Sequence, residues 1–309
     1  MPTIKDVARV AQVSPATVSY VLNQTATVSA KTRARVLAAV TQLDYQPHQQ
    51  ARNLQRQRTG TLGVVWVGSA ETTDFDLGTL IVHAVGAAAR LDYSLLVTPS
   101  VAHANAGRGV ADGWIVLGVA TQPISGTQVW GRYPPRGSAI PAVVADGAAA
   151  ARRAVASFVH AGCSRIALLM PPTNVRGAAR WYLGYRQALR QAKLPFVPTL
   201  VVEPQGATVA DGAAALEALL ASEVQFDAVL ACGGELAYGV AQAAPQHTWR
   251  LIAGADGPLV AGAQISALHW PTDLWGTLLV ERLVAALGGA APPLWTHLHP
   301  SLVVRHSSF

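Results

Sequence analysis

The side chains best suited to chemistry in this sequence lie near its start, and the chemistry that they suit is the binding of phosphate groups. A hydroxyl hydrogen-bonds a phosphate oxygen, which fixes the register of a protein on a nucleic acid without reading its sequence. Residues 1–60 contain eight Lys and Arg side chains against two Asp, whereas residues 61–309 contain fifteen basic and fifteen acidic ones. The whole net charge of +6 therefore lies in the first fifth of the chain, which indicates a polyanion-binding head on a neutral body. The candidate phosphate-binding hydroxyls are Thr3, Ser14, Thr17, Ser19, Ser29 and Thr32.

Three short helical patterns position these hydroxyls. Apolar residues at three- and four-residue spacing predict helices over residues 4–11, 15–22 and 30–43. Ser14 and Ser29 are expected to cap the second and third helices, and Pro15 stands at a first helical position, where its missing N–H costs nothing. Two helices joined by a short turn, with a small polar outer face on the second, are typical of a helix-turn-helix that enters the major groove of DNA. The inward faces are predicted to hold Ile4, Val7, Ala8, Ala11, Val18, Val21, Leu22, Val36, Leu37, Val40 and Leu43.

The rest of the chain has a different pattern, in which short apolar runs alternate with Ala-rich helical stretches. Such alternation predicts an α/β fold with parallel sheets that helices cover on both faces. The expected strands are 61–67, 95–98, 113–119, 142–145, 165–170, 199–202, 228–231 and 251–255. The expected helices are 78–91, 147–161, 178–192, 209–222, 236–244 and 272–287.

Composition bounds the class of protein. The chain has 309 residues and a mass of 32.3 kDa, and 13% of its residues are charged, against about 25% in an average domain. Residues of the hydrophobic types make up 51%, which is ample for a large core and excludes a disordered protein. No apolar run approaches the ~20 residues of a membrane span, no secretory core follows the start, and two cysteines make no disulfide framework. We therefore expect a cytoplasmic protein.

Catalytic and metal-binding chemistry find little support in the sequence. The pair His297 and His299 lacks carboxylate or cysteine partners, so alternating strand residues are the preferred interpretation. Cys163 and Cys232 have no paired His or Asp context and are expected to be buried thiols rather than nucleophiles. The sequence has no P-loop, nucleophile elbow or dinucleotide-binding fingerprint. We predict that the protein is not an enzyme and has neither metal nor cofactor.

Several segments resemble a known family. The stretch TIKDVARVAQVSPATVSYVLN, followed by VSAKTRARVLAAVTQLDYQP and HQQARNLQRQRTGTLGVV, closely resembles the lactose-repressor (LacI/GalR) family of bacterial transcription regulators. The match is dense over residues 3–67 and looser over 140–169, 185–195 and 300–308. The resemblance implies a small all-α helix-turn-helix head and a periplasmic-binding-protein-like sensor of two α/β lobes. It also implies a homodimer on a near-palindromic operator.

The resemblance assigns roles within the second helix. Pro15 and Ala16 match positions that face base edges, where apolar surface suits thymine methyl groups. Tyr20 departs from the family, which usually carries Arg there, so the preferred base pair is expected to differ or relax. Gln12 stands where the family turn commonly has Gly, and a left-handed Gln is expected to cost about 1 kcal/mol. Asn23 is a further predicted DNA contact.

The linker over residues 47–60 is polar and basic except for one large apolar residue, Leu54. By resemblance the linker folds on DNA into a short hinge helix, whose leucine wedges into a central minor-groove step beside a small neighbour. Leu54 and Ala51 match these two positions, and wedging bends the DNA onto more protein. Packing of Leu54 on the body is the alternative. His48 is also predicted to contact DNA.

The expected ligand cleft departs from the family pattern. By resemblance, effectors bind between the lobes through an Arg, an Asn-Asp pair and an Asp near a Gly. Here Trp181 takes the Arg position with Arg180 one residue earlier, Gly233 and Gly234 replace the Asn-Asp pair, Asp256 remains, and Trp270 stands where a polar residue is common. Trp181 and Trp270 suit stacking on a sugar or an aromatic effector, or equally the filling of a cleft without a ligand. The candidate effector residues are Arg180, Trp181, Asp256 and Trp270.

These observations together predict a DNA-binding transcriptional regulator. The expected parts are a helix-turn-helix domain over residues 1–46, a hinge over 47–60 and an effector-binding and dimerisation domain over 61–309. The leading hypothesis is a dimeric repressor of a palindromic operator, modulated by a small molecule such as a sugar, with no membrane partner. The alternative is a constitutive DNA-binding regulator whose body is a ligand-free dimerisation scaffold.

Overall fold

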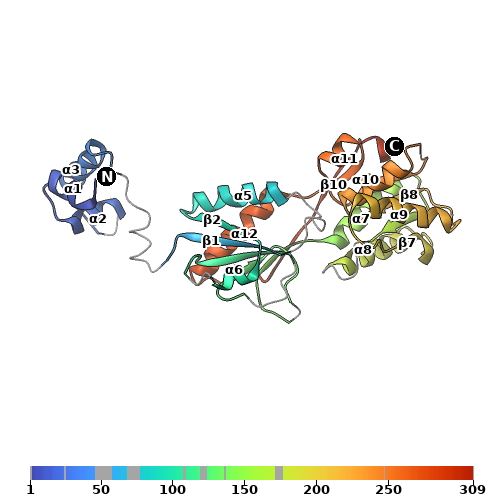
Figure 1. Cartoon of the computed structure of the whole chain (residues 1–309), viewed down its shortest axis with the longest axis horizontal. Coiled ribbons are helices and arrows are strands. Elements are labelled where there is room, and N and C mark those ends of the chain that lie inside the picture. The colour runs from blue at the N-terminus through green and yellow to red at the C-terminus, as the bar shows by residue number, and fades with distance from the viewer. Residues whose placement is uncertain are drawn as a thin grey trace. The chain divides into compact units, whose positions relative to one another are not determined.

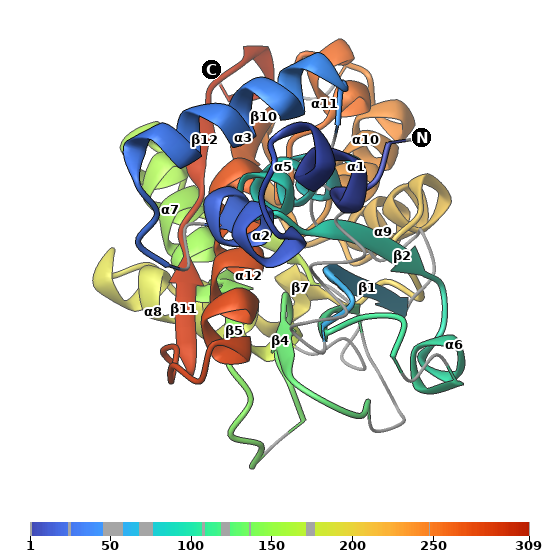
Figure 2. The ribbon, with the colours of Figure 1, turned by 90° about the vertical axis from the view of Figure 1, so that its left-hand side faces the viewer.

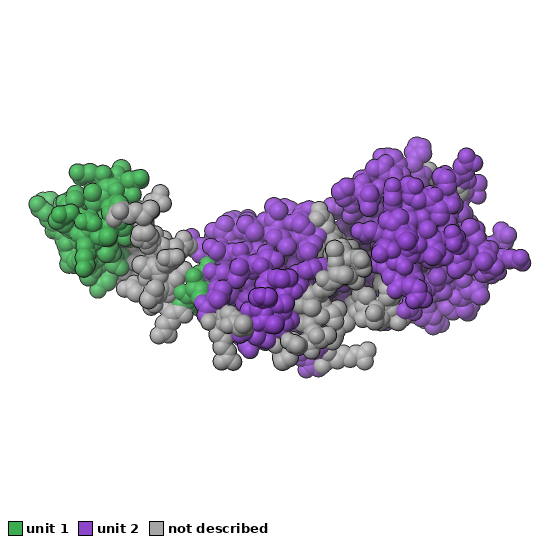
Figure 3. Space-filling view, viewed as in Figure 1, with its two compact units in different colours: residues 1–60 green, residues 61–309 purple. Residues whose placement is uncertain are grey.

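The computed structural model describes residues 2–23, 26–45, 58–67, 77–106, 109–118, 124–135, 137–170, 177–246 and 248–308. The chain divides into two compact units, residues 1–60 and residues 61–309 (Figure 3). Within the described ranges, no helix is both long enough and apolar enough to cross a membrane.

The described part of unit 1 contains three helices around a small apolar core (Figure 2). They are α1 (Ile4–Val10), α2 (Pro15–Asn23) and α3 (Ala30–Gln42), so the predicted helices are confirmed to within a residue at each end. The prediction for Leu37 was wrong, because this side chain is 48% exposed whereas Ala39 is buried. The inward stripe of α3 passes through residues 36, 39, 40 and 43, which turns position 37 toward solvent. The buried residues are Val7, Ala8, Ala11, Val18, Val21, Val36, Ala39 and Tyr45.

Unit 2 contains two sheets, and each is the centre of a lobe (Figure 1). The strands of lobe one are all parallel, in the order β11-β5-β4-β3-β1-β2. Helices α5 (Leu77–Arg90) and α12 (Thr272–Leu287) pack on one face, and α6 (Val101–Ala106) packs on the other. Side chains of β3 alternate between the two faces, with Ile115 and Leu117 toward α5 and α12 and Trp114 and Val116 toward α6. The strand bounds are Thr61–Val67 (β1), Ser94–Thr98 (β2), Gly113–Gly118 (β3), Gln128–Trp130 (β4), Ala142–Ala145 (β5) and Trp295–Leu298 (β11).

Lobe two has the same layered design. Its strand order is β12-β10-β9-β8-β6-β7, parallel except for the antiparallel edge pair of β10 and β12. Helices α7 (Gly147–His160) and α8 (Ala178–Gln191) cover one face, and α9 (Val209–Ala221), α10 (Gly234–Ala243) and α11 (Pro258–Gly262) cover the other. The strands are β6 (Ile166–Leu169), β7 (Val201–Val202), β8 (Ala228–Ala231), β9 (Arg250–Ala253), β10 (Ser266–His269) and β12 (Ser301–Val303), with 3-10 turns at Pro198–Leu200 and His306–Ser308.

The chain passes between the two lobes three times. It leaves lobe one after β5 at Asp146, returns after β10 at Trp270, and crosses again between β11 and β12 near His299. Each lobe is therefore built from separate stretches of sequence. Ligands of parallel sheets gather at the carboxyl ends of strands, and all three crossings leave from such ends.

The predicted fold class, a helical head with parallel α/β lobes, is confirmed. The strands over 61–67 and 142–145 were predicted to the residue, and the six long helices lie within two residues of their predicted bounds. The second half of the predicted strand over 199–202 is strand β7, and its first half belongs to the 3-10 turn Pro198–Leu200. The prediction omitted α6, α11, β4, β10 and β12, and it left β11 without bounds; all are six residues or shorter.

Candidate DNA-binding surface and interlobe cleft

Helices α2 and α3 begin with the same hydrogen-bonded cap. The Ser14 hydroxyl accepts the Thr17 N–H at 3.1 Å, and the Ser29 hydroxyl accepts the Thr32 N–H at 3.2 Å. In each cap the serine and threonine oxygens lie 2.9 Å apart. The remaining N–H groups of these exposed first turns attract a phosphate, since helix N-termini carry partial positive charge. The structure thus places four of the predicted hydroxyls at two helix starts.

The outer face of α2 has the predicted character. Pro15 and Ala16 are exposed in its first turn, and Tyr20 is 46% exposed one turn later. Val18 and Val21 are buried on the opposite side, so the helix is held in the unit with its small residues outward. Ser19 and Thr17 are half-buried beside this face. The side chain of Asn23, and His48, Ala51 and Leu54 of the linker, lie outside the described residues.

The turn before α2 carries the expected strain. Gln12 has a φ of 51°, the left-handed region that glycine occupies without cost. Its carbonyl accepts a long hydrogen bond of 3.4 Å from the Arg35 guanidinium on α3. Arg35 thereby links the turn to α3.

Thr3 is engaged within the head. Its N–H and its hydroxyl both donate to Asp6 Oδ2, at 2.9 and 2.8 Å, and this closes the start of α1. These hydrogen bonds, with the weaker attraction of Arg9 at 2.9 Å, hold the pKa of the Asp6 carboxyl below its usual range. Asp6 therefore stays ionised and offsets part of the charge of Arg9. The Thr3 hydroxyl already donates its hydrogen to Asp6, so it can only accept a further hydrogen bond.

In unit 2, the predicted effector residues Trp181 and Trp270 are both buried and touch each other. Their rings meet edge to face, with centroids 6.5 Å apart and planes at 75°. Trp270 Nε1 donates to the Gly254 carbonyl at 3.0 Å. Trp181 covers Gly147 so closely that a Cβ there would lie 2.6 Å from the indole. Since Gly147 and Trp270 both stand at lobe crossings, the pair packs two of the three connections together.

Arg180 lies in the first turn of α8 and reaches Asp146, which the sequence prediction missed. The guanidinium contacts Asp146 Oδ1 at 3.0 Å, and the same oxygen accepts the Ala148 N–H at the start of α7. Burial raises the pKa of the Asp146 carboxyl, but Arg180 and the N–H groups of α7 lower it by more, so the net pKa lies below the ordinary value. Arg180 also lies over the Tyr133 ring at 5.8 Å, and burial raises the pKa of Tyr133 to about 12.

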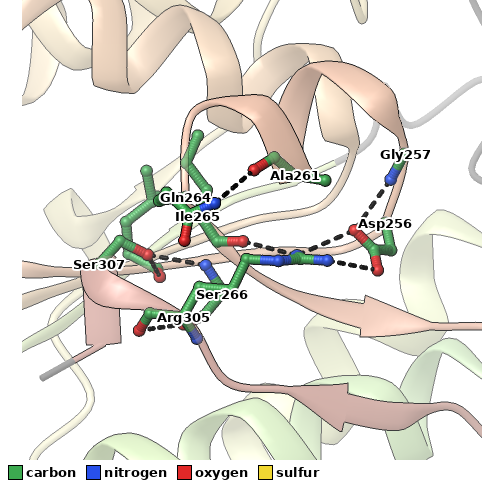
Figure 4. Close-up of polar contacts among 9 residues, drawn as sticks. Asp256, Gly257, Ala261, Gln264, Ile265, Ser266, Arg305 and Ser307 are labelled. Atoms are coloured by element: carbon green, nitrogen blue, oxygen red, sulfur yellow. Dashed lines mark hydrogen bonds and ion pairs between the residues drawn. The ribbon is translucent and has the colours of Figure 1, made fainter.

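Asp256 is paired with Arg305 from the end of the chain (Figure 4). Two guanidinium nitrogens contact the two carboxylate oxygens, each at 2.9 Å, and the Gly257 N–H adds a third hydrogen bond at 3.0 Å. Backbone and hydroxyl contacts between Ser266 and the Arg305–Ser307 segment fix this segment on lobe two. The charge of Asp256 is therefore balanced within the chain.

A cleft of about 220 Å³ lies between the lobes. Of the four candidate effector residues, Asp256 and Trp270 line it, whereas Arg180 and Trp181 are not among its lining residues. Gly233 and Gly234 at the start of α10 offer it no side chain. The sequence prediction missed the remaining walls, because they come from separate helices and a strand that only the folded chain brings together. These walls are Thr79, Gly257, Ala261, His269 and Thr272.

Two family models match the chain. Residues 3–48 match the bacterial regulatory proteins of the lacI family, and residues 155–308 match the periplasmic binding protein-like domain. The HTH-type transcriptional repressor PurR of Haemophilus influenzae is 30% identical over 274 residues, covering 81% of this chain and 78% of PurR. The HTH-type transcriptional regulator GalS of Salmonella typhimurium is 29% identical over 338 residues, covering 99% of this chain and 96% of GalS.

Solved structures share the fold over nearly the whole chain. The lac repressor dimer bound to operator and the anti-inducer ONPF superposes with a TM-score of 0.75 at 21% identity, covering 99% of both chains. The complex of the transcriptional regulator CelR with cellobiose gives 0.72 at 23% identity, covering 99% of this chain and 100% of CelR.

Proposed function

This chain belongs to the lacI family of bacterial regulatory proteins and is a DNA-binding regulator of transcription, and from that premise we propose that it binds a near-palindromic operator as a homodimer and represses transcription. The observation that carries the proposal is the exposed face of α2, with Pro15, Ala16 and Tyr20 outward beside two capped helix starts. In this proposal residues 1–46 form the DNA-binding domain, residues 47–60 the hinge with Leu54 as its wedge, and residues 61–309 the dimerisation and effector domain.

Apolar side chains of lobe one support the homodimer. Val82 on α5 is 68% exposed, and Val85 on the same helix and Leu96 and Val97 on the edge strand β2 are also exposed. Exposed apolar residues that gather in one region mark interaction sites, and helix α5 packs beside β2. Two-fold symmetry would set a second copy of the same face against the first and present two heads to two half-sites.

We propose a small, neutral, hydroxyl-rich effector, such as a sugar, for the interlobe cleft. The hydroxyls of Thr79 and Thr272 and the carboxylate of Asp256 line it, and Trp270 supplies an aromatic wall of the kind that stacks on sugars. Its volume lies below the ~300–1,000 Å³ of typical ligand pockets, which favours a small effector. Effector binding would change lobe closure, the spacing of the two hinges and so the affinity for the operator.

A second candidate is a constitutive regulator whose body is a ligand-free scaffold. The packing of Trp181 on Gly147 and Trp270 favours it, because these side chains fill space between the crossings. The pairing of Asp256 with Arg305 favours it as well, because a balanced carboxylate is a weaker acceptor for a ligand hydroxyl. The two candidates share the DNA-binding function and differ only in whether a ligand alters it.

Two measurements test these proposals in order. Selection of bound duplexes from random oligonucleotides with the full chain is expected to enrich a palindrome whose half-sites lie about 10 bp apart or a multiple of it. A monomer that enriches no sequence would contradict the homodimeric repressor. Calorimetry with a panel of sugars and nucleosides, followed by operator binding with each hit, then separates the candidates. A ligand that changes operator affinity supports the effector, and the absence of any such ligand supports the scaffold.

A further inference from the structure

The zero net charge of unit 2 conceals two strongly charged stretches that follow one another. Residues 147–193 carry eight Lys and Arg side chains and no acidic one, and residues 194–249 carry six Asp and Glu side chains and no Lys or Arg. The first stretch contains α7 and α8, and the second contains α9 and α10. In this part of lobe two, the basic residues therefore belong to the stretch with α7 and α8, and the acidic residues to the stretch with α9 and α10.

These two helix pairs cover opposite faces of one sheet (Figure 1). On β6, Ile166 and Leu168 point into the core under α7 and α8, and Ala167 and Leu169 point into the core under α9 and α10. Successive residues of a strand face opposite sides, so the two helix layers stand back to back. Lobe two consequently exposes basic side chains over α7 and α8 and, on the opposite side of the sheet, the carboxylates of Glu217 and Glu223 at the end of α9.

The basic face is continuous across α7 and α8. The two helices run side by side in the same direction, because Gly184 lies against Ala148 and, one turn later, Arg152 donates to Gln187 at 3.1 Å. The exposed cationic side chains of the face are Arg153, Arg186, Arg190 and Lys193. Arg186 is held over the rings of Tyr182 and Phe196, at 5.7 and 4.9 Å, so its guanidinium is ordered in advance of any contact.

Each face also has an exposed leucine among its charges. Leu183 is 50% exposed and precedes Arg186 and Arg190 by one and two turns of α8. Leu220 is 55% exposed on α9 and lies between the exposed Glu217 and Glu223. Among the residues that the structure describes, none of these four charged side chains joins an ion pair. An apolar centre with a charged rim is the usual composition of a protein interface.

We propose that the α7–α8 face of one copy docks on the outer face of α9, around Leu220, of another copy, which joins the proposed operator-binding dimers into larger assemblies. The occupant is a second copy, because this chain carries surfaces of both charges. Leu220 lies between Glu217 and Glu223 on one face. Leu183 lies beside Arg186 and Arg190 on the other. Such a contact is heterologous, because it joins two different surfaces. When two copies bind in this way, each still has one unoccupied surface that can bind a further copy. This contact is separate from the proposed dimer face on α5 and β2, so the proposal extends beyond the operator-binding dimer.

The test is sedimentation velocity of the full chain at low and moderate salt. Species larger than the dimer are expected at low salt and should disappear as salt rises, because the screening length falls from about 30 Å at 0.01 M to about 10 Å at 0.1 M. R186E/R190E and E217R/E223R are each expected to weaken association of dimers about tenfold or more, since like charges then face each other. The chain with all four changes, and a mixture of the two double variants, should associate again.

Controls separate this contact from the rest of the protein. E281R makes the same change as E217R at an exposed position of α12 in lobe one and should leave association unchanged. The face variants should remain dimers with unchanged affinity for a single operator. A wild-type chain that stays dimeric at low salt overturns the proposal. Weakening by only one of the two double variants also overturns the proposal, because the two surfaces would then not contact each other. A chain with all four changes that fails to associate overturns it as well.

Discussion

The DNA-binding head and the interlobe cleft use their polar groups in opposite ways. In the head, capped helix starts and the small residues Pro15 and Ala16 are turned to solvent. Within the described residues, the exposed side chains of Lys5, Lys31 and Arg35 form no ion pair. At the lobe crossings, Arg180 is paired with Asp146, Asp256 is paired with Arg305, and Trp270 donates to a backbone carbonyl. The head is thus prepared for a partner outside the chain, whereas the charged groups at the lobe crossings already have partners within it.

The largest expected effect concerns the packing of the crossings. Trp181→Ala should lower the free energy of unfolding by about 3–5 kcal/mol, because it removes a buried indole and leaves a cavity. Urea denaturation measures the change, and free indole should restore part of the stability by filling the space. Trp295→Ala is the matched control, since that ring is 45% exposed and should cost far less. Equal losses from both variants would mean that the Trp181 contact is not what holds the crossings.

A charge on the reading face should act on DNA binding and not on stability. Ala16→Asp is expected to weaken operator binding about 100-fold, because a carboxylate would then face the bases and phosphates of the duplex. Fluorescence anisotropy with the selected operator measures the loss, and circular dichroism checks the fold. Ala38→Asp adds the same charge at an exposed position of α3 and should cost much less. If both variants bind alike, the α2 face does not lie at the bases.

Salt should distinguish the two regions directly. Operator binding is expected to fall about tenfold or more between low and moderate salt, because several phosphates are neutralised per dimer and their counterions return. Titration of the complex with KCl provides the slope. The internal pairs of the cleft are partly buried and screened less, so the unfolding free energy should change little over the same range. A complex that ignores salt would contradict the phosphate contacts.

The smallest expected effect lies in the turn before α2. Gln12→Gly should raise the unfolding free energy of the head by less than about 1 kcal/mol, because the left-handed backbone at φ 51° costs a side chain about 1 kcal/mol. The gain is offset in part by the greater freedom of glycine in the unfolded chain. Thermal unfolding of the wild type and the variant, followed in parallel, gives the difference. Destabilisation instead would show that the Gln12 side chain contributes more than its backbone strain.

The same contrast explains what the sequence was able to predict. The caps at Ser14 and Ser29 and the outward Pro15 and Ala16 follow from local spacing, and the structure has them where the pattern requires. Leu37 was misplaced because an apolar residue on a small helix has no signal for which of two adjacent faces is buried. The pairs around the cleft join residues far apart in sequence, 34 positions for Arg180 with Asp146 and 49 for Arg305 with Asp256. Such pairs form only when the strands and helices are assembled, so no local pattern in the sequence predicts them.

The contacts of β11, β12 and α12 have a consequence for biosynthesis. The head contains residues from the first sixth of the chain alone, so it can fold while the ribosome is still translating. The sheet of lobe one waits for β11 to emerge, since that strand pairs with β5 about 150 positions earlier, and lobe two waits for β12 and Arg305. Nearly the entire body must therefore leave the exit tunnel before either lobe is complete, so the head of a nascent chain is folded before the surface of the proposed dimer exists.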